Sequence, residues 1–233
     1  LSMSTHLEMM RAIASAVSIP LIADIDTGFG NAVSVSYIIP QYEAAGASAI
    51  VMEDKTFPKD TSLRAQGRQE LVRIEEFQGK IAAAVDAKKD KDFVIIARVE
   101  ALIAGLGQEE ALKRGLAYEE AGADAILIHS KQKTPDEILT FIEAWTGQIP
   151  LVLVPTAYPQ LTEADIASLG KVRIVIYGNH AIRAAVGAIR KVFAQIRSDG
   201  GIQGVENTIP SVKDIIALQG DEHMRGLERK FLR

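Results

Sequence analysis

Six short apolar runs, separated by segments with helical spacing, constrain the fold of this chain most strongly. The runs are apolar at successive positions, which is typical of parallel strands that are buried beneath helices on the sheet. We expect strands over residues 21–24, 49–53, 93–98, 125–129, 151–154 and 173–176. This alternation of helix and strand predicts an α/β fold with a parallel sheet.

The segments between the runs carry apolar residues three to four positions apart, as amphipathic helices do. We expect helices over residues 5–17, a segment ending near 45, 74–87, 108–121, 135–145, 163–169, 181–196, 211–219 and 222–231. A partial internal repeat supports this layout, because residues 42–53 align with residues 118–129 as helix end, glycine, short turn and buried strand. The repeat places Glu53 and His129 at equivalent strand ends.

The number of apolar runs is smaller than the number of strands in a closed barrel. A closed (β/α)8 barrel of the TIM type has about eight strands, whereas this chain supplies six apolar runs. We expect a single domain over residues 1–233 that holds the last six βα units of such a barrel, without its first two units, followed by C-terminal helices. A complete open sheet of six strands is the alternative that the sequence leaves open.

Polar residues follow each of the apolar runs. In parallel α/β folds the carboxyl ends of all strands open on one face, so residues scattered through the sequence meet there. The segments in question are Asp24-Ile25-Asp26, Glu53-Asp54-Lys55, Arg98-Val99-Glu100, His129-Ser130, Pro155-Thr156 and Tyr177-Gly178-Asn179-His180. Acids, an arginine and a histidine in one pocket indicate a metal-assisted active site.

Composition narrows the classes of partner. The 26 basic and 30 acidic residues give a net charge of −4 without a long block of one sign, so nucleic-acid or membrane binding has no electrostatic support. We expect a small-molecule partner. The absence of cysteine excludes disulfides, thiolate metal sites and cysteine catalysis, and it fits a cytoplasmic enzyme. No apolar run approaches the roughly 18 residues of a membrane span.

The first acidic pair suits a hard cation. Asp24 and Asp26 lie at a strand end, and glycines at positions 28 and 30 allow a tight turn beside a ligand. Carboxylate oxygens are ligands that Mg²⁺ prefers. The alternative is that Asp26 or Asn31 caps the following helix. Glu53, in a second acidic pair, is either part of the same metal site or a surface charge.

The other polar ends have structural alternatives too. Arg98 could bind an anionic group of a substrate, or form an ion pair with Glu53 or Glu100. His129 is a site residue or a hydrogen-bonded core histidine, and His180 could serve only as a helix cap. His6 and His223 are expected at solvent or at an interface. The long polar loop over residues 55–70 is either an active-site lid or a solvated loop.

Together these segments resemble the phosphoenolpyruvate mutase/isocitrate lyase superfamily over the whole chain. Residues 24–31 look like its metal-site motif, residues 53–55 like its next acidic motif, and residues 98–101 and 129–130 like its arginine and histidine strands. The resemblance implies a TIM-type barrel in which two further βα units come before the part seen here. It also implies Mg²⁺, for which Mn²⁺ could substitute, held by Asp24 directly and by Asp26 and Glu53 through water.

The sequence of the loop over residues 55–70 distinguishes between branches of the superfamily. Lyases of the family carry a catalytic cysteine there, whereas this chain has Lys59-Asp60-Thr61-Ser62 and no cysteine. Thr61 stands where the mutases carry asparagine, and it resembles the branch that hydrolyses the carbon–phosphorus bond of 3-phosphonopyruvate to pyruvate and phosphate. This resemblance implies that Lys59, Thr61, Arg98 and His129 act in catalysis and that Ser62 joins them in binding substrate.

Several alternatives remain at this level. Thr61 either positions the attacking water or attacks phosphorus itself. The chain could instead be a mutase, a carbon–carbon lyase acting on a 2-oxo acid, or an inactive truncated barrel.

The C-terminal helices over residues 211–233 carry apolar faces that need a partner. Their apolar residues are Ile215, Ile216, Leu218, Met224, Leu227 and Phe231. The family resemblance implies that these helices are exchanged between subunits of a homodimer or homotetramer.

Overall fold

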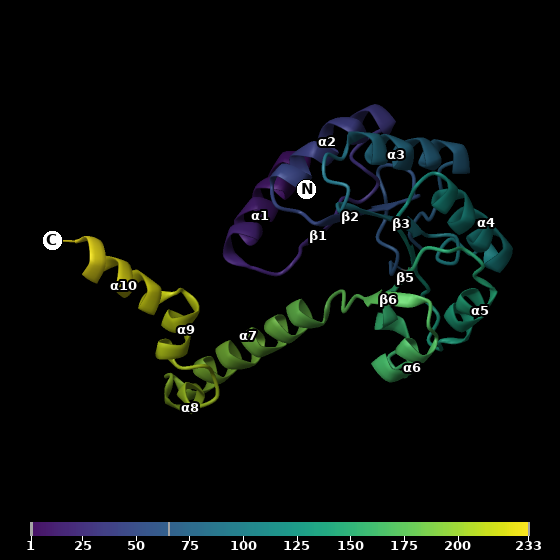
Figure 1. The fold of residues 1–233 in the computed structure, drawn as a ribbon. Helices are drawn as coiled ribbons and strands as arrows, with labels where there is room; N and C mark the ends of the chain where they lie inside the picture. Colours follow the sequence, from purple (N-terminus) through teal and green to yellow (C-terminus); the bar gives the residue numbers. More distant parts are fainter. Residues whose placement is uncertain (1, 65, 233) are drawn as a thin grey trace. The chain divides into compact units, whose positions relative to one another are not determined.

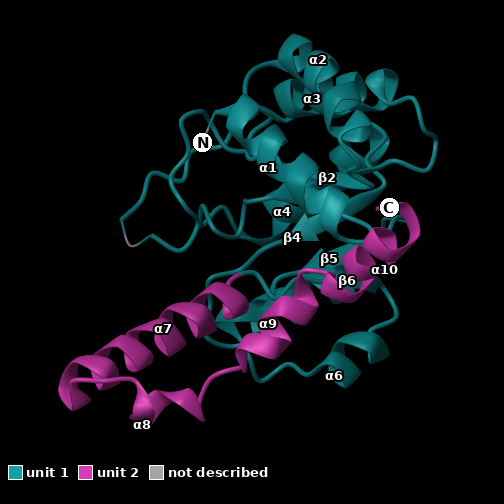
Figure 2. Cartoon of the chain, turned by 90° about the vertical axis from the view of Figure 1, so that its left-hand side faces the viewer, with its two compact units in different colours: residues 1–178 teal, residues 179–233 magenta. Residues whose placement is uncertain are grey.

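The computed structural model describes residues 2–64 and 66–232, and its helices and strands alternate along the chain (Figure 1). Two compact units divide the chain, residues 1–178 and residues 179–233 (Figure 2). The first unit contains the sheet, and the second is built from helices.

Among the residues that the structure describes, the first unit contains six strands and six α-helices. The strands are β1 (Ile22–Asp24), β2 (Ala49–Glu53), β3 (Val94–Val99), β4 (Ala125–Ile128), β5 (Leu151–Leu153) and β6 (Val172–Val175). The helices are α1 (Met3–Ala16), α2 (Ala32–Ala44), α3 (Ile74–Ala87), α4 (Gly107–Glu120), α5 (Asp136–Ala144) and α6 (Glu163–Ser168), with the short 3₁₀ helix η1 (Pro155–Ala157) after β5. The bounds differ from the predicted ones by a few residues at most.

The six strands form one parallel sheet in the order β1-β2-β3-β4-β5-β6. Neighbouring strands are therefore also consecutive in the sequence, as in a barrel with a helix after each strand. Helices α1 to α5 lie around the outside of the curled sheet in Figure 1. The predicted α/β fold with a parallel sheet is confirmed.

The two faces of the sheet have different neighbours. On the outer face, residues such as Ile50, Ile95 and Ile126 pack against the helices in the main hydrophobic core. The inner face has its own cluster, formed by Ala49, Val51, Ile96, Ala125, Leu127 and Val152. Because side chains alternate along a strand, the inner face also receives the residues two positions further along each of these strands.

The second unit contains α7 (His180–Asp199), α8 (Gln203–Glu206), α9 (Val212–Leu218) and α10 (Asp221–Phe231). Ser211 caps α9, because its hydroxyl oxygen accepts a hydrogen bond from the Asp214 N–H. The Asp214 carboxylate in turn accepts a hydrogen bond from the Ser211 hydroxyl. The predicted C-terminal helices are present. Helix α8 was not predicted, because four residues are too few to show a helical period.

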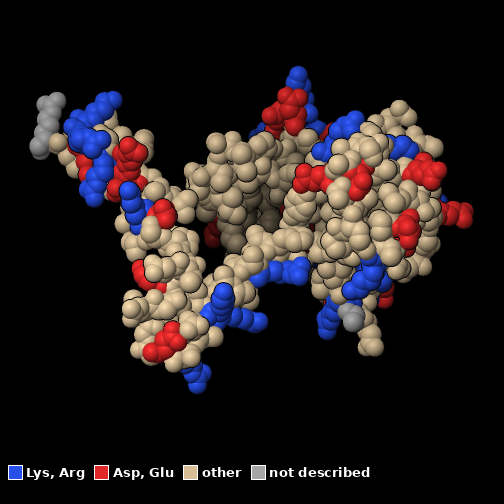
Figure 3. All heavy atoms as spheres, turned by 90° about the horizontal axis from the view of Figure 1, so that it is seen from below, with Lys and Arg blue, Asp and Glu red and all other residues tan. Residues whose placement is uncertain are grey.

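Charged side chains of both signs are interspersed over the face that Figure 3 shows. This distribution agrees with the small net charge of −4. Within residues 2–64 and 66–232, none of the helices is long and apolar enough to cross a membrane.

Candidate active site

Alternation along the strands brings the predicted polar residues to one place. Glu53 at the end of β2 pairs in register with Arg98 on β3, and both share the inner face with Val51 and Ile96. The Glu53 N–H donates to the Asp26 carbonyl at 2.8 Å, which fixes the residues after β1 beside the end of β2. The carboxyl end of the sheet is therefore the candidate site.

The turn after β1 holds the first acidic pair. Oδ1 of Asp24 accepts a hydrogen bond from the Asp26 N–H at 3.0 Å, and Asp26 has a φ of 54°, a left-handed conformation that aspartate tolerates. Gly28 follows with a φ of 88°, and a Cβ there would lie 2.7 Å from Sδ of Met52. Asn31 rather than Asp26 caps α2, since its Oδ1 accepts from Val33 N at 3.0 Å and from Ser34 N at 3.2 Å.

Lys59 of the lid loop, as we call residues 55–70, joins two of the predicted metal ligands. Its Nζ lies 2.6 Å from Oδ1 of Asp26 and 2.9 Å from Oε1 of Glu53. Burial disfavours the charge on Lys59, but Glu53, Asp26 and Asp24 around it raise its pKa. The ammonium thus balances the carboxylates in this structure.

Glu53 is the buried member of this acidic group. It is 1% exposed, and burial raises its pKa although Arg98 and Lys59 act in the opposite direction. Its carboxylate oxygens find no hydrogen-bond partner of good geometry in the described part of the chain, even though both cations lie within ion-pair distance. Such a carboxylate retains the capacity to bind a cation or its water shell.

Asp24, Asp26 and Glu53 supply only oxygen ligands, which is the donor chemistry that Mg²⁺ takes. Among the described residues, no three His, Cys, Asp or Glu side chains are already arranged to hold a metal ion. The three carboxylates are the kind of ligand that Mg²⁺ binds, and the Glu53 oxygens have no hydrogen-bond partner elsewhere in the described chain that would compete with it. The assignment of these residues as metal ligands stays a prediction.

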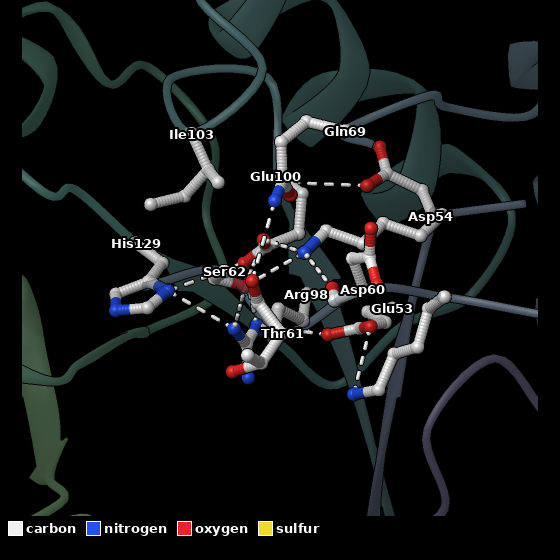
Figure 4. Close-up of polar contacts among 12 residues, drawn as sticks. Glu53, Asp54, Asp60, Thr61, Ser62, Gln69, Arg98, Glu100, Ile103 and His129 are labelled. Atoms are coloured by element: carbon white, nitrogen blue, oxygen red, sulfur yellow. Dashed lines mark hydrogen bonds and ion pairs between the residues drawn. The ribbon is translucent and has the colours of Figure 1, made fainter. Parts of the chain in front are cut away.

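Arg98 is the centre of a buried polar cluster (Figure 4). Its Nε lies 2.7 Å from Oε1 of Glu100 and 3.3 Å from Oε2 of Glu53, so the ion-pair alternative for Arg98 is realised with both acids. Its Nη2 donates to Oγ of Ser62 at 2.9 Å and lies 3.0 Å from Nδ1 of His129. Arg98 therefore joins two strand ends and the lid loop.

His129 is buried against this cluster, and its protonation follows from its neighbours. Nδ1 lies 3.0 Å from the Arg98 donor and 3.3 Å from Oε1 of Glu100. Nδ1 cannot accept a hydrogen bond from the Arg98 guanidinium and also donate one to the Glu100 carboxylate, because a ring nitrogen that carries a proton has no free lone pair. Burial lowers the pKa of His129, and the Arg98 charge acts in the same direction. We therefore assign a neutral ring that accepts at Nδ1 and carries its proton on Nε2.

Lys55 and Glu100 were not predicted as site residues, although both belong to the segments that mark the site. Lys55 is 1% exposed, and its Nζ lies 2.9 Å from Oε2 of Glu100. Burial alone would raise the pKa of Glu100, but the positive charges of Arg98 and Lys55 hold it well below the usual range of a glutamate. The signal for Glu100 was available, because it stands two positions after Arg98 on the same face.

The lid loop is attached at its ends and at its middle. The Thr56 N–H donates to the Glu70 carbonyl at 3.0 Å, which closes the base of the loop. Ser62 is 7% exposed, and its hydroxyl donates to Oε2 of Glu100 at 2.5 Å. Thr61 is exposed beside it, and its carbonyl accepts from Nε2 of Gln69 at 3.3 Å. The alternative of a wholly solvated loop does not hold for Ser62.

A cavity of about 460 Å³ adjoins the middle of the lid loop. Its lining consists of Ser62, Leu63, Arg64, Gln66, Lys131, Lys133, Thr156 and Ala157. The volume suits a small metabolite, and the basic side chains favour an anionic one. Lys131 and Lys133 follow β4, and Thr156 follows β5, so this cavity opens at the same end of the sheet as the polar cluster.

Asp54 supports the site from the outer face of the sheet. Its Oδ2 accepts from the Tyr118 hydroxyl at 2.7 Å and from Nη1 of Arg114 at 3.0 Å, and its Oδ1 accepts from the Glu100 N–H at 3.0 Å. Tyr118 and Arg114 lie on α4. The network fixes the ends of β2 and β3 to each other and to this helix.

The remaining histidines lie elsewhere. His180 is the first residue of α7, after the N-cap Asn179, and belongs to the second unit. His223 is exposed on α10, as predicted. The prediction for His6 was wrong: its ring is partly buried, and its Nδ1 lies 2.6 Å from the Tyr42 hydroxyl, because α1 packs against α2.

A protein-family model matches most of this chain. The model described as phosphoenolpyruvate phosphomutase covers residues 1–197 of this chain. Among known proteins, the phosphonopyruvate hydrolase of Variovorax sp. (strain Pal2) is 80% identical over 233 residues, which are 100% of this chain and 80% of that protein. The phosphoenolpyruvate phosphomutase of Tetrahymena pyriformis is 41% identical over 226 residues, or 97% of this chain and 75% of that protein.

Two solved structures that resemble this chain are structures of the same two kinds of enzyme. A crystal structure of phosphonopyruvate hydrolase in complex with oxalate and Mg²⁺ matches with a TM-score of 0.94 and 77% identity, covering 100% of this chain and 80% of that one. The phosphoenolpyruvate phosphomutase from Streptomyces platensis subsp. rosaceus matches with a TM-score of 0.97 and 43% identity over the same shares. The six-stranded sheet is thus part of a TIM-type barrel fold, as predicted.

Proposed function

The chain belongs to the phosphoenolpyruvate phosphomutase family, and from that premise we propose that it hydrolyses the carbon–phosphorus bond of 3-phosphonopyruvate. The observation that carries this proposal is the 80% identity over the whole chain to a phosphonopyruvate hydrolase. The reaction consumes one water, breaks the carbon–phosphorus bond, forms a phosphorus–oxygen bond, and yields pyruvate and phosphate. Thr61, Lys59, Arg98 and His129 are the proposed catalytic residues.

Asp24, Asp26 and Glu53 are the proposed holders of Mg²⁺. Support comes from their oxygen donors, from the unsatisfied buried oxygens of Glu53, and from the related hydrolase whose crystal structure contains Mg²⁺. When bound, the ion supplies positive charge that stabilises the enolate left by cleavage of the carbon–phosphorus bond. The Lys59 ammonium contacts Asp26 and Glu53 here, and with these carboxylates engaged by the ion it would be free to contact the substrate.

The phosphonyl group carries negative charge that positive and donor groups must balance as it is transferred. Arg98 is held by Glu53 and Glu100 so that its guanidinium stays on the inner face of the sheet. His129 in the neutral form assigned above offers an Nε2 proton rather than a charge. Arg98, His129 and Lys59 are therefore proposed to bind the substrate anion, and Ser62, whose only proton goes to Glu100, is proposed to hold the Arg98 guanidinium in place for that binding.

Thr61 separates hydrolysis from transfer in this proposal. Its side chain is exposed on the lid loop next to buried Ser62, where a water can reach it. The hydroxyl either orients the attacking water or attacks phosphorus itself, forming a phosphothreonine that water then hydrolyses. In both cases the enolate carbon takes up the proton that completes pyruvate. The asparagine that the family resemblance implies at this position in mutases can only hold the group, so water access at Thr61 favours the hydrolase.

Phosphorus NMR of 3-phosphonopyruvate incubated with the protein and Mg²⁺ tests this function. We expect inorganic phosphate to appear, and its appearance to stop when a chelator removes the metal. A phosphoenolpyruvate signal would instead establish a mutase, which the 41% and 43% identical relatives keep as the second candidate. An unchanged substrate spectrum in the presence of Mg²⁺ would contradict both.

A further inference from the structure

Lys55 has no role in the function proposed above, yet its ammonium is a buried charge in contact with the lid loop. The residue is 1% exposed. Its Nζ donates to Oγ of Ser62 at 2.8 Å and to the Asp60 carbonyl at 3.1 Å, and it lies 2.9 Å from Oε2 of Glu100. An ammonium has three donors, so each of its protons has an acceptor.

Two of these acceptors flank Thr61 in the sequence. Asp60 precedes the threonine and Ser62 follows it, so one buried nitrogen holds the chain on both sides of the exposed side chain. The Thr61 carbonyl is held as well, by the Arg64 N–H at 3.1 Å and by Nε2 of Gln69 at 3.3 Å. The direction of the Thr61 hydroxyl therefore depends on these anchors.

The Ser62 hydroxyl closes the network. It accepts from Lys55 and from Nη2 of Arg98 at 2.9 Å, and it donates its own proton to Glu100 at 2.5 Å. A displacement of the lid loop would leave a buried ammonium, a guanidinium and a carboxylate with unmatched groups at the same time, which is strongly unfavourable. These contacts thus hold residues 60–62 of the lid loop in one position over the strand ends.

We propose that Lys55 is a positioning residue that clamps residues 60 and 62 and thereby holds the Thr61 hydroxyl in its working place. The proposal rests on the proposed function for the role of Thr61, whereas the clamp itself does not depend on any substrate. It predicts that the loss of Lys55 loosens the lid loop and slows the chemical step, with little effect on substrate binding.

The test replaces the ammonium without emptying its space. Lys55→Met removes the donors and keeps most of the side-chain volume, while Lys55→Gln keeps one donating nitrogen, which carries two N–H donors and no charge. Lys171→Met is the matched control, because Nζ of Lys171 also has three acceptors, the backbone carbonyls of Ile142, Glu143 and Trp145, at the opposite end of the sheet.

Limited proteolysis measures the clamp independently of activity. Arg64 and Arg68 of the lid loop are 64% and 47% exposed, so trypsin can report how often the loop opens. We expect cleavage after these two arginines to be about tenfold faster in Lys55→Met, since such cleavage follows the open population. Lys55→Gln is expected between Lys55→Met and the unmodified protein, and Lys171→Met at the rate of the unmodified protein.

Steady-state kinetics with 3-phosphonopyruvate and Mg²⁺ measures positioning. We expect kcat to fall about 100-fold in Lys55→Met, the order of loss that a misplacement of about 1 Å causes, while KM changes little. Unchanged cleavage, or faster cleavage with unchanged kcat, would overturn the proposal.

If the unmodified protein releases no phosphate, the proposed function fails, and the cleavage rates alone decide the clamp. If circular dichroism shows that Lys55→Met does not fold, Lys55→Gln gives the deciding comparison.

Discussion

At the scale of single residues, exposed Thr61 and buried Ser62 are neighbours with opposite surroundings. Ser62 is occupied on every side by Lys55, Arg98 and Glu100. The Thr61 side chain is thus the hydroxyl of this pair that is left accessible to a substrate or a water.

Thr61→Ala tests that difference. We expect kcat for phosphate release to fall about 100-fold or more, which is typical of the loss of a group that takes part in proton transfer, with KM within a few-fold of its original value. Thr146→Ala is a suitable control, because Thr146 is exposed in the loop that precedes β5 at the other end of the sheet. Phosphate release at the original rate would exclude Thr61 from the reaction.

Glu100 allows a prediction about stability and pH. Its pKa is lowered in the folded protein, so between that value and its usual value of about 4.3 the unfolded chain binds more protons. Stability from Glu100 is therefore complete above that usual value and is lost as the pH falls toward the folded pKa.

Glu100→Gln is expected to cost about 3 kcal/mol at pH 7, because it leaves the buried Lys55 ammonium without a counter-charge and leaves Arg98 with Glu53 alone. The measurement is urea unfolding at pH 7, 5, 4 and 3. The difference in unfolding free energy between variant and original should be equal at pH 7 and 5 and should shrink at pH 4 and 3, below the usual pKa of a glutamate. A difference that stays constant would show that the Glu100 charge does not contribute.

At the scale of helices and strands, the alternation of buried strand residues was enough to place much of the candidate site. Arg98 and His129 were predicted at the strand ends because their strands are apolar up to that point, and they lie together as expected. The lid contacts could not be predicted this way. The spacing of apolar residues does not indicate that the Lys55 side chain points inward to Ser62, because a loop has no repeating backbone geometry from which a side-chain direction could be predicted.

The same limit applies to the packing of helices against the site. Asp54 stands one position beyond Glu53 and therefore faces the outer side, where α4 supplies Tyr118 and Arg114. The sequence shows an acid after a strand in both cases. Only the parity of the strand separates the inward candidate ligand from the outward structural anchor.

Helix α3 makes a comparable link to the turn after β1, and this link gives a third prediction. Lys80 is 4% exposed, and its Nζ donates to the Thr27 carbonyl at 3.0 Å, one residue after Asp26. Lys80→Met should raise the Mg²⁺ concentration needed for half-maximal activity by about tenfold, as the loss of groups that orient metal ligands does.

Metal titration of phosphate release is the measurement for Lys80→Met. Lys88→Met serves as the control, because Lys88 directly follows α3 and its Nζ donates to the Phe93 carbonyl at 2.7 Å, away from the turn. An unchanged metal requirement would mean that the turn holds its conformation without Lys80.

At the scale of the whole molecule, the second unit exposes the apolar faces that the sequence predicted. Met224, Leu227 and Phe231 of α10 are 47%, 44% and 63% exposed, and their spacing places them on one face of the helix. Leu218 of α9 is 84% exposed. A continuous face of this kind is unfavourable in water and indicates a surface that a partner covers.

We propose that this partner is a second copy of the chain, through exchange of the C-terminal helices in a homodimer or homotetramer. Light scattering after size exclusion should give the mass of an oligomer for the original protein. The variant Leu227→Glu/Phe231→Glu should give that of a monomer, because two charges would then be buried in an apolar interface. Arg229→Glu changes the charge of the same helix but not its apolar face, so it should keep the oligomer. A monomeric original protein would show that the face is covered in some other way.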